Sequence, residues 1–326
     1  MEFMDVLCKK SSEKGLWLER KEKPQISEDE ILVKVTSTAI CGTDLHIYEW
    51  DKWSQETIKP PVTLGHEFVG VVAEKGSQVF SVEIGDRVSA EGHIVCGLCR
   101  NCRAGAKHAC SKTIGLGIHK DGAFAEYVKI PKDNIYKIPS NISNSEAAIF
   151  DPFGNAVFAS SIFNVSGEDV LITGAGPVGV MTALVCQHLG ARKIVITDVN
   201  DFRLNLLSDE PRIFPLNIKN NSIEEITGSL NIDEGFNLLF EMSGNNTAFK
   251  SLIQASGYGA NIISLGVFPE DIQLDFNKII FKNINIRGIY GRAIFDTWYK
   301  MTAYLQSGLS LKRVITHHLK YQDYEK

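Results

Sequence analysis

Four cysteines lie within one short segment of the sequence, HIVCGLCRNCRAGAKHAC. They are Cys96, Cys99, Cys102 and Cys110. Their spacing, C-x2-C-x2-C-x7-C, is typical of a structural zinc site, in which four thiolates from one loop bind a tetrahedral ion. An iron-sulfur cluster is the alternative, but the ferredoxin spacing ends C-x3-C-P, and this segment has neither feature. Because four protein ligands leave no position for a substrate, we expect this metal to hold a lobe and take no part in catalysis.

A second group of polar residues precedes this lobe, in the segments CGTDLH and GHE. It offers Cys41, Thr43, His46, His66 and Glu67. Thiolate, imidazole and carboxylate are all ligands of catalytic zinc. A buried cysteine or a hydrogen-bonded core histidine explains any single one of these residues at least as often. On their own, these residues leave a metal site and ordinary packing both open.

The segment TGAGPVG has the G-x-G-x-x-G spacing of a dinucleotide-binding turn. Gly174, Gly176 and Gly179 stand between an apolar run, DVLITG, and an apolar helical run. In that context the three glycines allow the tight turn, the approach of the backbone to a pyrophosphate, and the packing of helix on strand. Asp198 ends the next apolar run, where a carboxylate can bind the ribose hydroxyls. We therefore expect NAD in preference to NADP, although Arg203 raises the NADP alternative.

The two halves of the sequence differ in their secondary-structure pattern. Residues 31–138 form short alternating runs broken by Gly, Pro and Asp, which predicts a mostly β domain. After Asp151 the runs DVLITG, PVGVMTALVCQHLG and KIVITD predict a strand, a helix and a strand, and the alternation continues to INIRGIYG. This order predicts a doubly wound parallel sheet. We expect Pro211 and Pro215 to end a helix, and AIFDTWYKMTAYLQSGL to form a last one.

Composition limits the possible functions. A chain of 326 residues is longer than one hydrophobic core usually supports, so we expect two domains. A net charge of -5 argues against a nucleic-acid partner, because such proteins concentrate Lys and Arg. Seven cysteines, an odd number, together with the lack of a signal-peptide pattern, favour reduced thiols in the cytoplasm. No apolar run is long enough to span a membrane, so we expect no membrane partner.

Several segments, taken in order, resemble a known family. CGTDLH, GHEFVG, GDRV, the four-cysteine lobe, GAGPVG and ITDVN are similar to those of the zinc-dependent medium-chain alcohol dehydrogenases. The resemblance covers essentially the whole sequence and implies an α/β protein. It consists of a GroES-like, mostly β catalytic domain and a Rossmann coenzyme domain with a doubly wound parallel sheet, with the active site between them.

The same resemblance implies the domain boundaries. We expect residues 1–150 to form the catalytic domain, residues 151–289 to form the NAD-binding domain, and residues 290–326 to return to the catalytic domain. Members of the family continue through about one more helix and a closing strand. We therefore expect the catalytic domain to be shortened at its C-terminal end.

The resemblance also implies roles for the second group of polar residues. Cys41 and His66 match ligands of the catalytic zinc, and Glu67, Asp151 and a water or substrate oxygen compete for the remaining positions. Alcohol dehydrogenases of the family have a third cysteine near Asp151, so a carboxylate there implies a harder and weaker site. We expect Glu67 to contact zinc at some stage and Asp151 to be essential nearby. The catalytic residues that the resemblance implies are Thr43 and His46, as a proton relay, together with Asp151.

Other matches extend to the cofactor and the substrate. Positions that line the dinucleotide in the family correspond here to Pro177, Val178, Leu265, Gly266, Val267, Ile289 and Tyr290. The segments CGTDLHIYEWDKWSQ, AIFDPFGNAV and TWYKM are most similar to the branch of the family that oxidises L-threonine. That branch implies two zinc ions per chain, one catalytic and one structural, and a homo-oligomer, with a tetramer favoured.

For L-threonine, the implied reaction is oxidation of the secondary hydroxyl to L-2-amino-3-oxobutanoate, with zinc-assisted transfer of a hydride to NAD. His93 is a candidate for contact with the amino acid, and a structural role for it is equally compatible with the sequence. A polyol or other secondary-alcohol dehydrogenase of the same family is the nearest alternative. A catalytically silent NAD(H)-binding protein is the alternative from another class.

Overall fold

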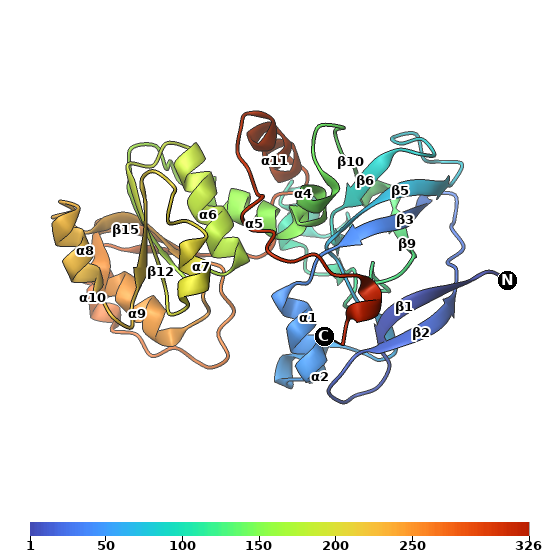
Figure 1. Ribbon diagram of the computed structural model, residues 1–326, viewed down its shortest axis with the longest axis horizontal. Coiled ribbons are helices and arrows are strands. Elements are labelled where there is room, and N and C mark those ends of the chain that lie inside the picture. Colours follow the sequence, from blue (N-terminus) through green and yellow to red (C-terminus); the bar gives the residue numbers. More distant parts are fainter. Residues whose placement is uncertain (326) are drawn as a thin grey trace. The chain divides into compact units, whose positions relative to one another are not determined.

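The computed structural model describes residues 1–325 and divides into two compact units (Figure 1). Unit 1 comprises Met1–Pro152 and Ala293–Thr302, and unit 2 comprises Phe153–Arg292 and the described chain from Ala303 onward. Each unit has its own hydrophobic core. Among the described helices, none has the length and apolar character needed to cross a bilayer.

Unit 1 is built mainly from antiparallel strands. Its largest sheet has five strands in the order β10-β6-β5-β3-β9, in which β3 (Glu30–Thr38) pairs with β5 (Phe68–Lys75) on one side and with β9 (Tyr127–Pro131) on the other. Ile31, Val33 and Val72 of this sheet are completely or almost completely buried. The strands β2-β1-β4 form a second sheet, and β7 pairs with β8. The remaining strands of unit 1 are β1 (Phe3–Lys9), β2 (Trp17–Glu22), β4 (Val62–Thr63), β6 (Arg87–Ala90), β7 (His93–Ile94), β8 (Ile114–Gly115) and β10 (Ile135–Lys137).

Two of the short helices of unit 1, α2 and α4, begin at side chains that cap them. Asp51 accepts a hydrogen bond from the backbone N–H of Ser54 at the start of α2, and Ser143 caps α4 with Glu146 in a capping box. The α-helices associated with this unit are α1 (Gly42–Glu49), α2 (Lys52–Thr57), α3 (Arg100–Arg103), α4 (Asn144–Ala148), α5 (Phe150–Ser160), which continues into unit 2, and α11 (Asp296–Gln306). Three short 3-10 helices complete the described chain, at Lys107–Ala109, Lys132–Asn134 and Tyr321–Asp323.

Unit 2 contains one parallel sheet of six strands in the order β13-β12-β11-β14-β15-β16. Numbered within the unit, this order is 3-2-1-4-5-6, which is that of a Rossmann fold. Its central strand β11 is buried along its whole length, as a strand covered on both faces must be. The strands are β11 (Asp169–Thr173), β12 (Lys193–Asp198), β13 (Ile213–Asn217), β14 (Phe236–Glu241), β15 (Ser256–Ser264) and β16 (Asn285–Gly288).

Helices cover both faces of this sheet (Figure 1). One face packs Ile172 and Ile196 against Val180 and Leu204 of α6 and α7, whereas the other packs Leu171 against helices α8 to α10. The alternation of side chains along each strand directs successive residues to opposite faces. The helices are α6 (Pro177–His188), α7 (Asp201–Asn205), α8 (Ile223–Ser229), α9 (Asn246–Ala255) and α10 (Phe276–Phe281).

The chain near residue 210 differs from the sequence-based expectation. We expected Pro211 and Pro215 to end a helix, but α7 already ends at Asn205, and Pro215 lies inside β13. A proline is tolerated there because β13 is the edge strand of the sheet.

The last part of the described chain also differs from the predicted division. Residues from Ala303 onward belong to unit 2, whereas residues 290–326 were expected to return to the catalytic domain. Arg313 attaches this part of the chain to unit 2. It donates hydrogen bonds to Asp209 and to the carbonyl oxygen of Leu206, and it forms an ion pair with Glu210. Val314 adds an apolar contact with the core of unit 2.

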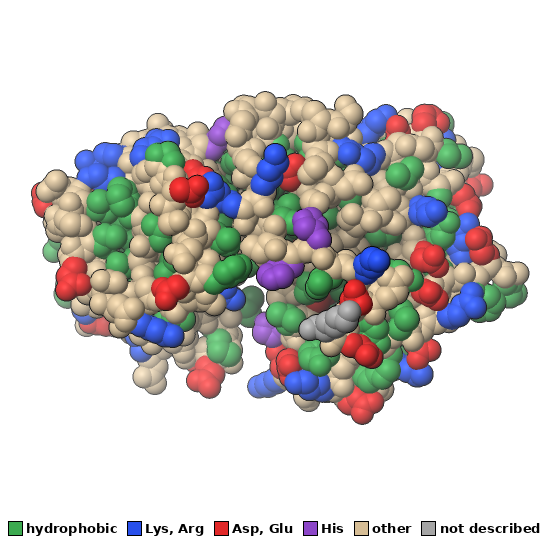
Figure 2. Space-filling view, in the orientation of Figure 1, with side chains coloured by type: hydrophobic (Ala, Val, Ile, Leu, Met, Phe, Trp, Pro, Cys, Tyr) green, Lys and Arg blue, Asp and Glu red, His purple; other side chains and the backbone are tan. Residues whose placement is uncertain are grey.

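Charged side chains of both signs are interspersed over the face of the molecule drawn in Figure 2. Many of them form exposed ion pairs, for example Lys14 with Glu49 at 2.7 Å. Such pairs contribute little to stability, but their mixture leaves no extended basic surface on this face. This arrangement agrees with the net charge of -5.

A returning segment, Ala293–Thr302, anchors to unit 1 through Trp298. The indole of Trp298 is fully buried and donates a hydrogen bond of 2.9 Å to the carboxylate of Glu91. Its ring packs 5.1 Å from that of Tyr136, centroid to centroid, and the Tyr136 hydroxyl lies 2.8 Å from Thr302 Oγ1. The buried Trp298 side chain and these hydrogen bonds therefore hold the segment in unit 1.

We expect Trp298→Phe to lower the free energy of unfolding by about 2–4 kcal/mol, because it removes buried volume and a donor to a buried carboxylate. Chemical denaturation monitored by circular dichroism measures the effect. Tyr299→Phe is the matched control, since the Tyr299 side chain is exposed, and it should change stability by less than about 0.5 kcal/mol. Equal stability of Trp298→Phe and the wild-type protein would show that this anchor is dispensable.

Candidate functional site

Three of the predicted zinc ligands lie together in unit 1. The ligand atoms of Cys41, His66 and Glu67 are all within 4.8 Å of one another. Cys41 is the N-cap residue of α1, and the other two residues directly precede β5. The Nδ1 atom of His66 is buried and has no hydrogen-bond partner among the described residues. A thiol, an imidazole and a buried carboxylate in this arrangement fit a divalent metal such as zinc.

A close approach of backbones holds His66 and Glu67 in place. Gly65 has φ 88°, and a Cβ atom there would overlap Phe124. A Cβ atom on Gly117 would lie 2.7 Å from the carbonyl oxygen of Gly65, and one on Gly122 would overlap the same oxygen. Only residues without side chains can pack in this way.

Burial controls the charge of this group of ligands. Burial, and next the negative charge of Glu67, hold the pKa of the Cys41 thiol well above its usual range. Burial also raises the pKa of Asp44, and the nearby His66 opposes that shift. The Asp44 carboxylate accepts a hydrogen bond of 2.9 Å from the backbone N–H of Cys41. A bound cation would supply the positive charge that a thiolate requires here.

Asp151 lies near this group but is not part of it. Among the described residues, the atoms that meet within 4.8 Å are those of Cys41, His66 and Glu67. A Cβ atom on Gly92 would lie 3.5 Å from Asp151 Oδ2 and 3.6 Å from His66 Cβ, so both side chains border this loop residue. The charge of Asp151 nevertheless contributes to raising the pKa of Cys41.

His93 follows this loop and is held by a buried carboxylate. Its Nδ1 atom is 2.7 Å from Glu91 Oε1, and its backbone N–H donates to the same oxygen at 3.0 Å. Asn134 donates hydrogen bonds to the carbonyl oxygens of Glu91 and His93. The sequence does not identify Glu91 and Asp44 as site residues, because each acts on a neighbour that only the fold identifies.

The two relay candidates lie one turn apart on α1. Thr43 Oγ1 is 3.6 Å from Cys41 Sγ, so its hydroxyl adjoins the ligand group. His46 is exposed, with Nδ1 2.5 Å from Asp51 Oδ2. A spacing of three residues places Thr43 and His46 on the same face of the helix. The arrangement suits transfer of a proton from the ligand group toward solvent.

The four cysteines of the lobe also lie together. The sulfur atoms of Cys96, Cys99, Cys102 and Cys110 are within 4.8 Å of one another, and all four residues are free thiols. The backbone N–H groups of Cys102 and Ser111 lower the pKa of Cys99 to about 6. Backbone N–H groups also lower the pKa of Cys110, with that of Cys96 the strongest. The backbone thus favours the thiolate form, which binds zinc, at Cys99 and Cys110, whereas burial raises the pKa of Cys102 to about 12.

The glycine-rich turn lies between β11 and α6 in unit 2. Gly176 is the N-cap of α6, Pro177 follows it, and no side-chain hydrogen bond caps this end of the helix. A Cβ atom on Gly179 would overlap the carbonyl oxygen of Gly174, whereas one on Gly176 would meet no atom within 4 Å. The helix therefore presents N–H groups to an open space in front of Gly176, which suits a pyrophosphate.

Asp198 ties the second strand of the sheet to this turn. Its Oδ2 atom accepts a hydrogen bond of 2.7 Å from the backbone N–H of Ala175, and its Oδ1 atom accepts from those of Val199 and Asn200. The guanidinium of Arg203 is 3.9 Å from Oδ2. The carboxylate thus shapes the turn in addition to any contact with a ribose.

The other predicted cofactor residues lie at the carboxyl ends of β15 and β16, in the segments Leu265–Val267 and Ile289–Tyr290. Val267 and Tyr290 are exposed, and the backbone N–H of Ile289 donates to the carbonyl oxygen of Ser264. Sequence analysis missed Glu241, which ends β14 and is fully buried. It accepts hydrogen bonds from the N–H groups of Ser243 and Gly244 and so fixes the neighbouring loop.

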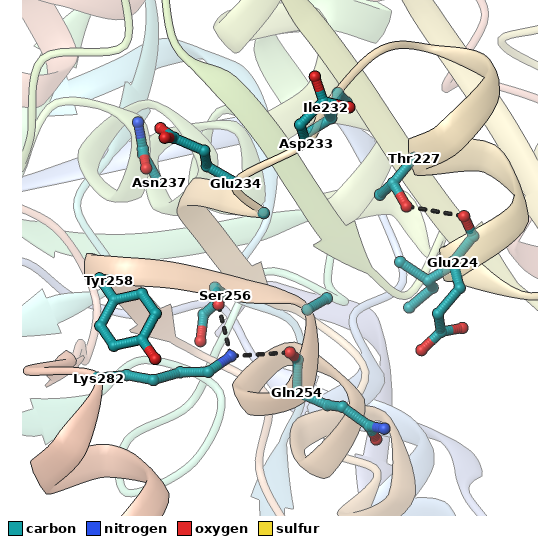
Figure 3. A pocket seen from close by; sticks show the side chains of 13 residues that line it. Glu224, Thr227, Ile232, Asp233, Glu234, Asn237, Gln254, Ser256, Tyr258 and Lys282 are labelled. Atoms are coloured by element: carbon teal, nitrogen blue, oxygen red, sulfur yellow. Dashed lines mark hydrogen bonds between the residues drawn. The ribbon is translucent and has the colours of Figure 1, made fainter.

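A cavity of about 600 Å³ in unit 2 contains none of the predicted site residues (Figure 3). It lies beside the amino ends of β14 and β15, whereas dinucleotides bind at the carboxyl ends of such strands. Lys282 crosses it and donates hydrogen bonds to the carbonyl oxygens of Gln254 and Ser256. The cavity is therefore separate from the dinucleotide turn.

Comparison with known proteins identifies the family. The sequence matches the alcohol dehydrogenase GroES-like domain over residues 27–140 and the zinc-binding dehydrogenase domain over residues 177–307. It is 50% identical over 322 residues to the L-threonine 3-dehydrogenase of Marinomonas sp. (strain MWYL1), which covers 99% of this chain and 94% of the relative. The chain belongs to the zinc-binding alcohol dehydrogenase family.

Two solved structures share this fold, one holding NADH and the other NADP. A protein described as a short chain alcohol dehydrogenase, from E. coli CFT073 and complexed with NADH, has a TM-score of 0.90 at 26% identity, over 100% of this chain and 94% of that one. A zinc-binding dehydrogenase from Sinorhizobium meliloti 1021 bound to NADP has a TM-score of 0.89 at 26% identity, over 96% and 91%. This chain is therefore an oxidoreductase of the zinc-binding dehydrogenase family.

Two glycine substitutions separate folding of this dehydrogenase from cofactor binding. Gly176 has φ -66°, which any residue adopts, so Gly176→Ala should leave the melting temperature unchanged. The added methyl group would face the pyrophosphate, and we expect NADH to bind at least about tenfold more weakly. Fluorescence titration with NADH measures the affinity.

Gly179→Ala is the companion variant, and it should lower both the melting temperature and the affinity, because its methyl group would overlap the Gly174 carbonyl oxygen. An unchanged affinity for NADH in both variants would contradict the assignment of this turn.

Proposed function

We propose that the protein is an NAD-dependent L-threonine 3-dehydrogenase that oxidises the secondary hydroxyl of L-threonine to L-2-amino-3-oxobutanoate. The identity of 50% to a relative of that name, over 99% of this chain, carries the proposal. The ligand group of Cys41, His66 and Glu67 supports it, because an alcohol dehydrogenase of this family needs a catalytic metal. In the reaction, a hydride leaves Cβ of threonine for the nicotinamide ring, and the hydroxyl proton is released.

The catalytic zinc would be held by Cys41, His66 and Glu67. When bound, zinc supplies a Lewis acid that makes a secondary hydroxyl a stronger acid. Glu67 and Asp151 leave this site richer in oxygen than a site with three sulfur or nitrogen ligands, which favours a metal that exchanges more readily. Asp151 and His66 both lie next to Gly92, and the charge of Asp151 contributes to raising the pKa of Cys41. We assign it an essential role there.

Thr43 and His46 would carry the proton away. The Thr43 hydroxyl accepts the proton of the substrate hydroxyl and donates its own, so its net charge does not change. His46 stands one turn further along α1 and is exposed, so its ring can receive that proton and release it to water.

Asp198 favours NAD as the cofactor. A carboxylate at the end of the second strand binds ribose hydroxyls and repels the 2′-phosphate of NADP. Arg203 is already paired with Asp198 at 3.9 Å, which reduces its availability for a phosphate. Pro177 and Val178 at the start of α6, with Leu265, Gly266, Val267, Ile289 and Tyr290, would line the remainder of the cofactor site.

A second zinc ion would occupy the four-cysteine lobe. Four thiolates complete its coordination, so this ion would stabilise the lobe and take no part in the reaction. The chain would then bind two zinc ions of different function. Seven free cysteines without a disulfide suit the reducing cytoplasm, where we place the enzyme.

We also propose that the enzyme is a homo-oligomer, with a tetramer favoured. The edge strand β16 is exposed along its whole length. Beside it in unit 2, α10 exposes Phe276, Ile280 and Phe281. An exposed strand edge next to apolar side chains is a surface that commonly pairs with a second copy.

Rates of NADH formation with a panel of alcohols test the proposed activity. For the zinc-loaded protein, kcat/KM for L-threonine should exceed that for sorbitol and for 2-butanol by at least about a hundredfold. Protein groups that bind the ammonium and carboxylate of threonine would have no partner when an uncharged alcohol is bound. Replacement of NAD by NADP should lower the rate. Faster turnover of sorbitol would support a dehydrogenase activity but contradict L-threonine as the substrate. No turnover of any alcohol would contradict the dehydrogenase activity itself.

A further inference from the structure

The corner between α1 and α2 brings a carboxylate back over the relay histidine. Helix α1 ends at Glu49, and Trp50 adopts the left-handed conformation with φ 57° and ψ 45°. Its backbone N–H donates to the carbonyl oxygen of His46. This left-handed residue is followed by Asp51, the N-cap of α2, whose carboxylate lies beside His46.

The two oxygens of Asp51 have different partners. Oδ2 is 2.5 Å from His46 Nδ1, whereas Oδ1 accepts a hydrogen bond of 2.9 Å from the backbone N–H of Ser54. Burial alone would raise the pKa of Asp51, but the Ser54 N–H and then the His46 ring outweigh it and lower the pKa. Asp51 is therefore an ionised carboxylate at neutral pH, fixed in orientation by the helix that it caps.

A buried lysine fixes the corner from the other side. Lys9 is fully buried, and its ammonium donates hydrogen bonds to the carbonyl oxygens of Gly15 and Tyr48. The same nitrogen lies 4.8 Å from the centroid of the Trp50 ring, which is a cation–π contact. On the outer side, Trp53 packs edge-on against His46. The position of Asp51 relative to His46 is thus determined by its surroundings.

We propose that Asp51 is a positioning residue that fixes the tautomer of His46 in the relay. This inference rests on the proposed function of His46. An ionised carboxylate can only accept hydrogen bonds, so the ring nitrogen that faces it, Nδ1, must carry a proton. In the neutral ring, Nε2 then has a lone pair and is the atom that can receive the proton arriving from the substrate.

The proton balance follows from this geometry. When Nε2 binds the arriving proton, the imidazolium is stabilised by the negative charge of Asp51, which keeps its own charge throughout. Water then removes the proton from Nε2, and the ring returns to the same tautomer. The side chain of His46 is 55% exposed, so the pair adds little to stability, and its effect is on orientation.

Asp51→Asn tests the assignment because asparagine retains the helix cap but not the charge. Its amide group can donate to Nδ1 and would favour the proton on Nε2. We expect kcat for L-threonine to fall by about tenfold to a thousandfold, with KM changed less than about threefold. Glu49→Gln is the matched control, since it also removes one negative charge from this corner. The wild-type Glu49 is paired with Lys14. This control should leave kcat unchanged.

Nitrogen chemical shifts of the ring separate positioning from a general loss of structure. With ¹⁵N-labelled histidine in mildly alkaline buffer, His46 should carry its proton on Nδ1 in the wild-type protein and in Glu49→Gln, and on Nε2 in Asp51→Asn. A wild-type ring protonated on Nε2, or an unchanged tautomer in Asp51→Asn, would overturn the proposal. The tautomer is measured without substrate, so a wild-type protein inactive on every alcohol would contradict the proposed function separately.

Discussion

The catalytic half of the molecule depends on a contact between backbones without side chains. Gly65, Gly117 and Gly122 approach one another so closely that a Cβ atom on any of them would meet or overlap a neighbour. The residue after Gly65 is His66, and Glu67 follows it before β5 begins. The close approach therefore determines where two of the three ligand side chains start. Cys41 reaches the same point from the beginning of α1.

Burial of these ligands disfavours their negatively charged forms, and a bound metal ion would offset this effect. The thiol of Cys41 has a raised pKa, first because it is buried and then because Glu67 lies beside it. Without a cation, the group keeps a proton and cannot act as a set of anionic ligands. A divalent ion reverses this balance, so metal binding and deprotonation are coupled in the same site. The four-cysteine lobe differs, because backbone N–H groups already favour the thiolate of Cys99.

Local spacing predicted the parts of this protein that local geometry determines. The four cysteines, the three glycines of the dinucleotide turn and the alternation of strands and helices are each contained within a short segment. Glu91 and Asp44 were not predicted, because a buried carboxylate shows its function only through the partners that the fold provides. Asp51 depends on a left-handed residue at Trp50, which sequence does not indicate. The attachment of the last residues to unit 2 depends on Arg313 and partners about a hundred residues earlier.

We propose that Cys41, His66 and Glu67 hold the metal on which activity depends, while the cysteine lobe holds a second metal for structure. Zinc content and L-threonine oxidation, measured together in Cys41→Ser and Cys102→Ser, test it most directly. We expect each variant to lose about one zinc ion per chain. Cys41→Ser should keep its melting temperature but lose activity, whereas Cys102→Ser should melt at a lower temperature. A Cys41→Ser protein with full zinc content and full activity would contradict the account.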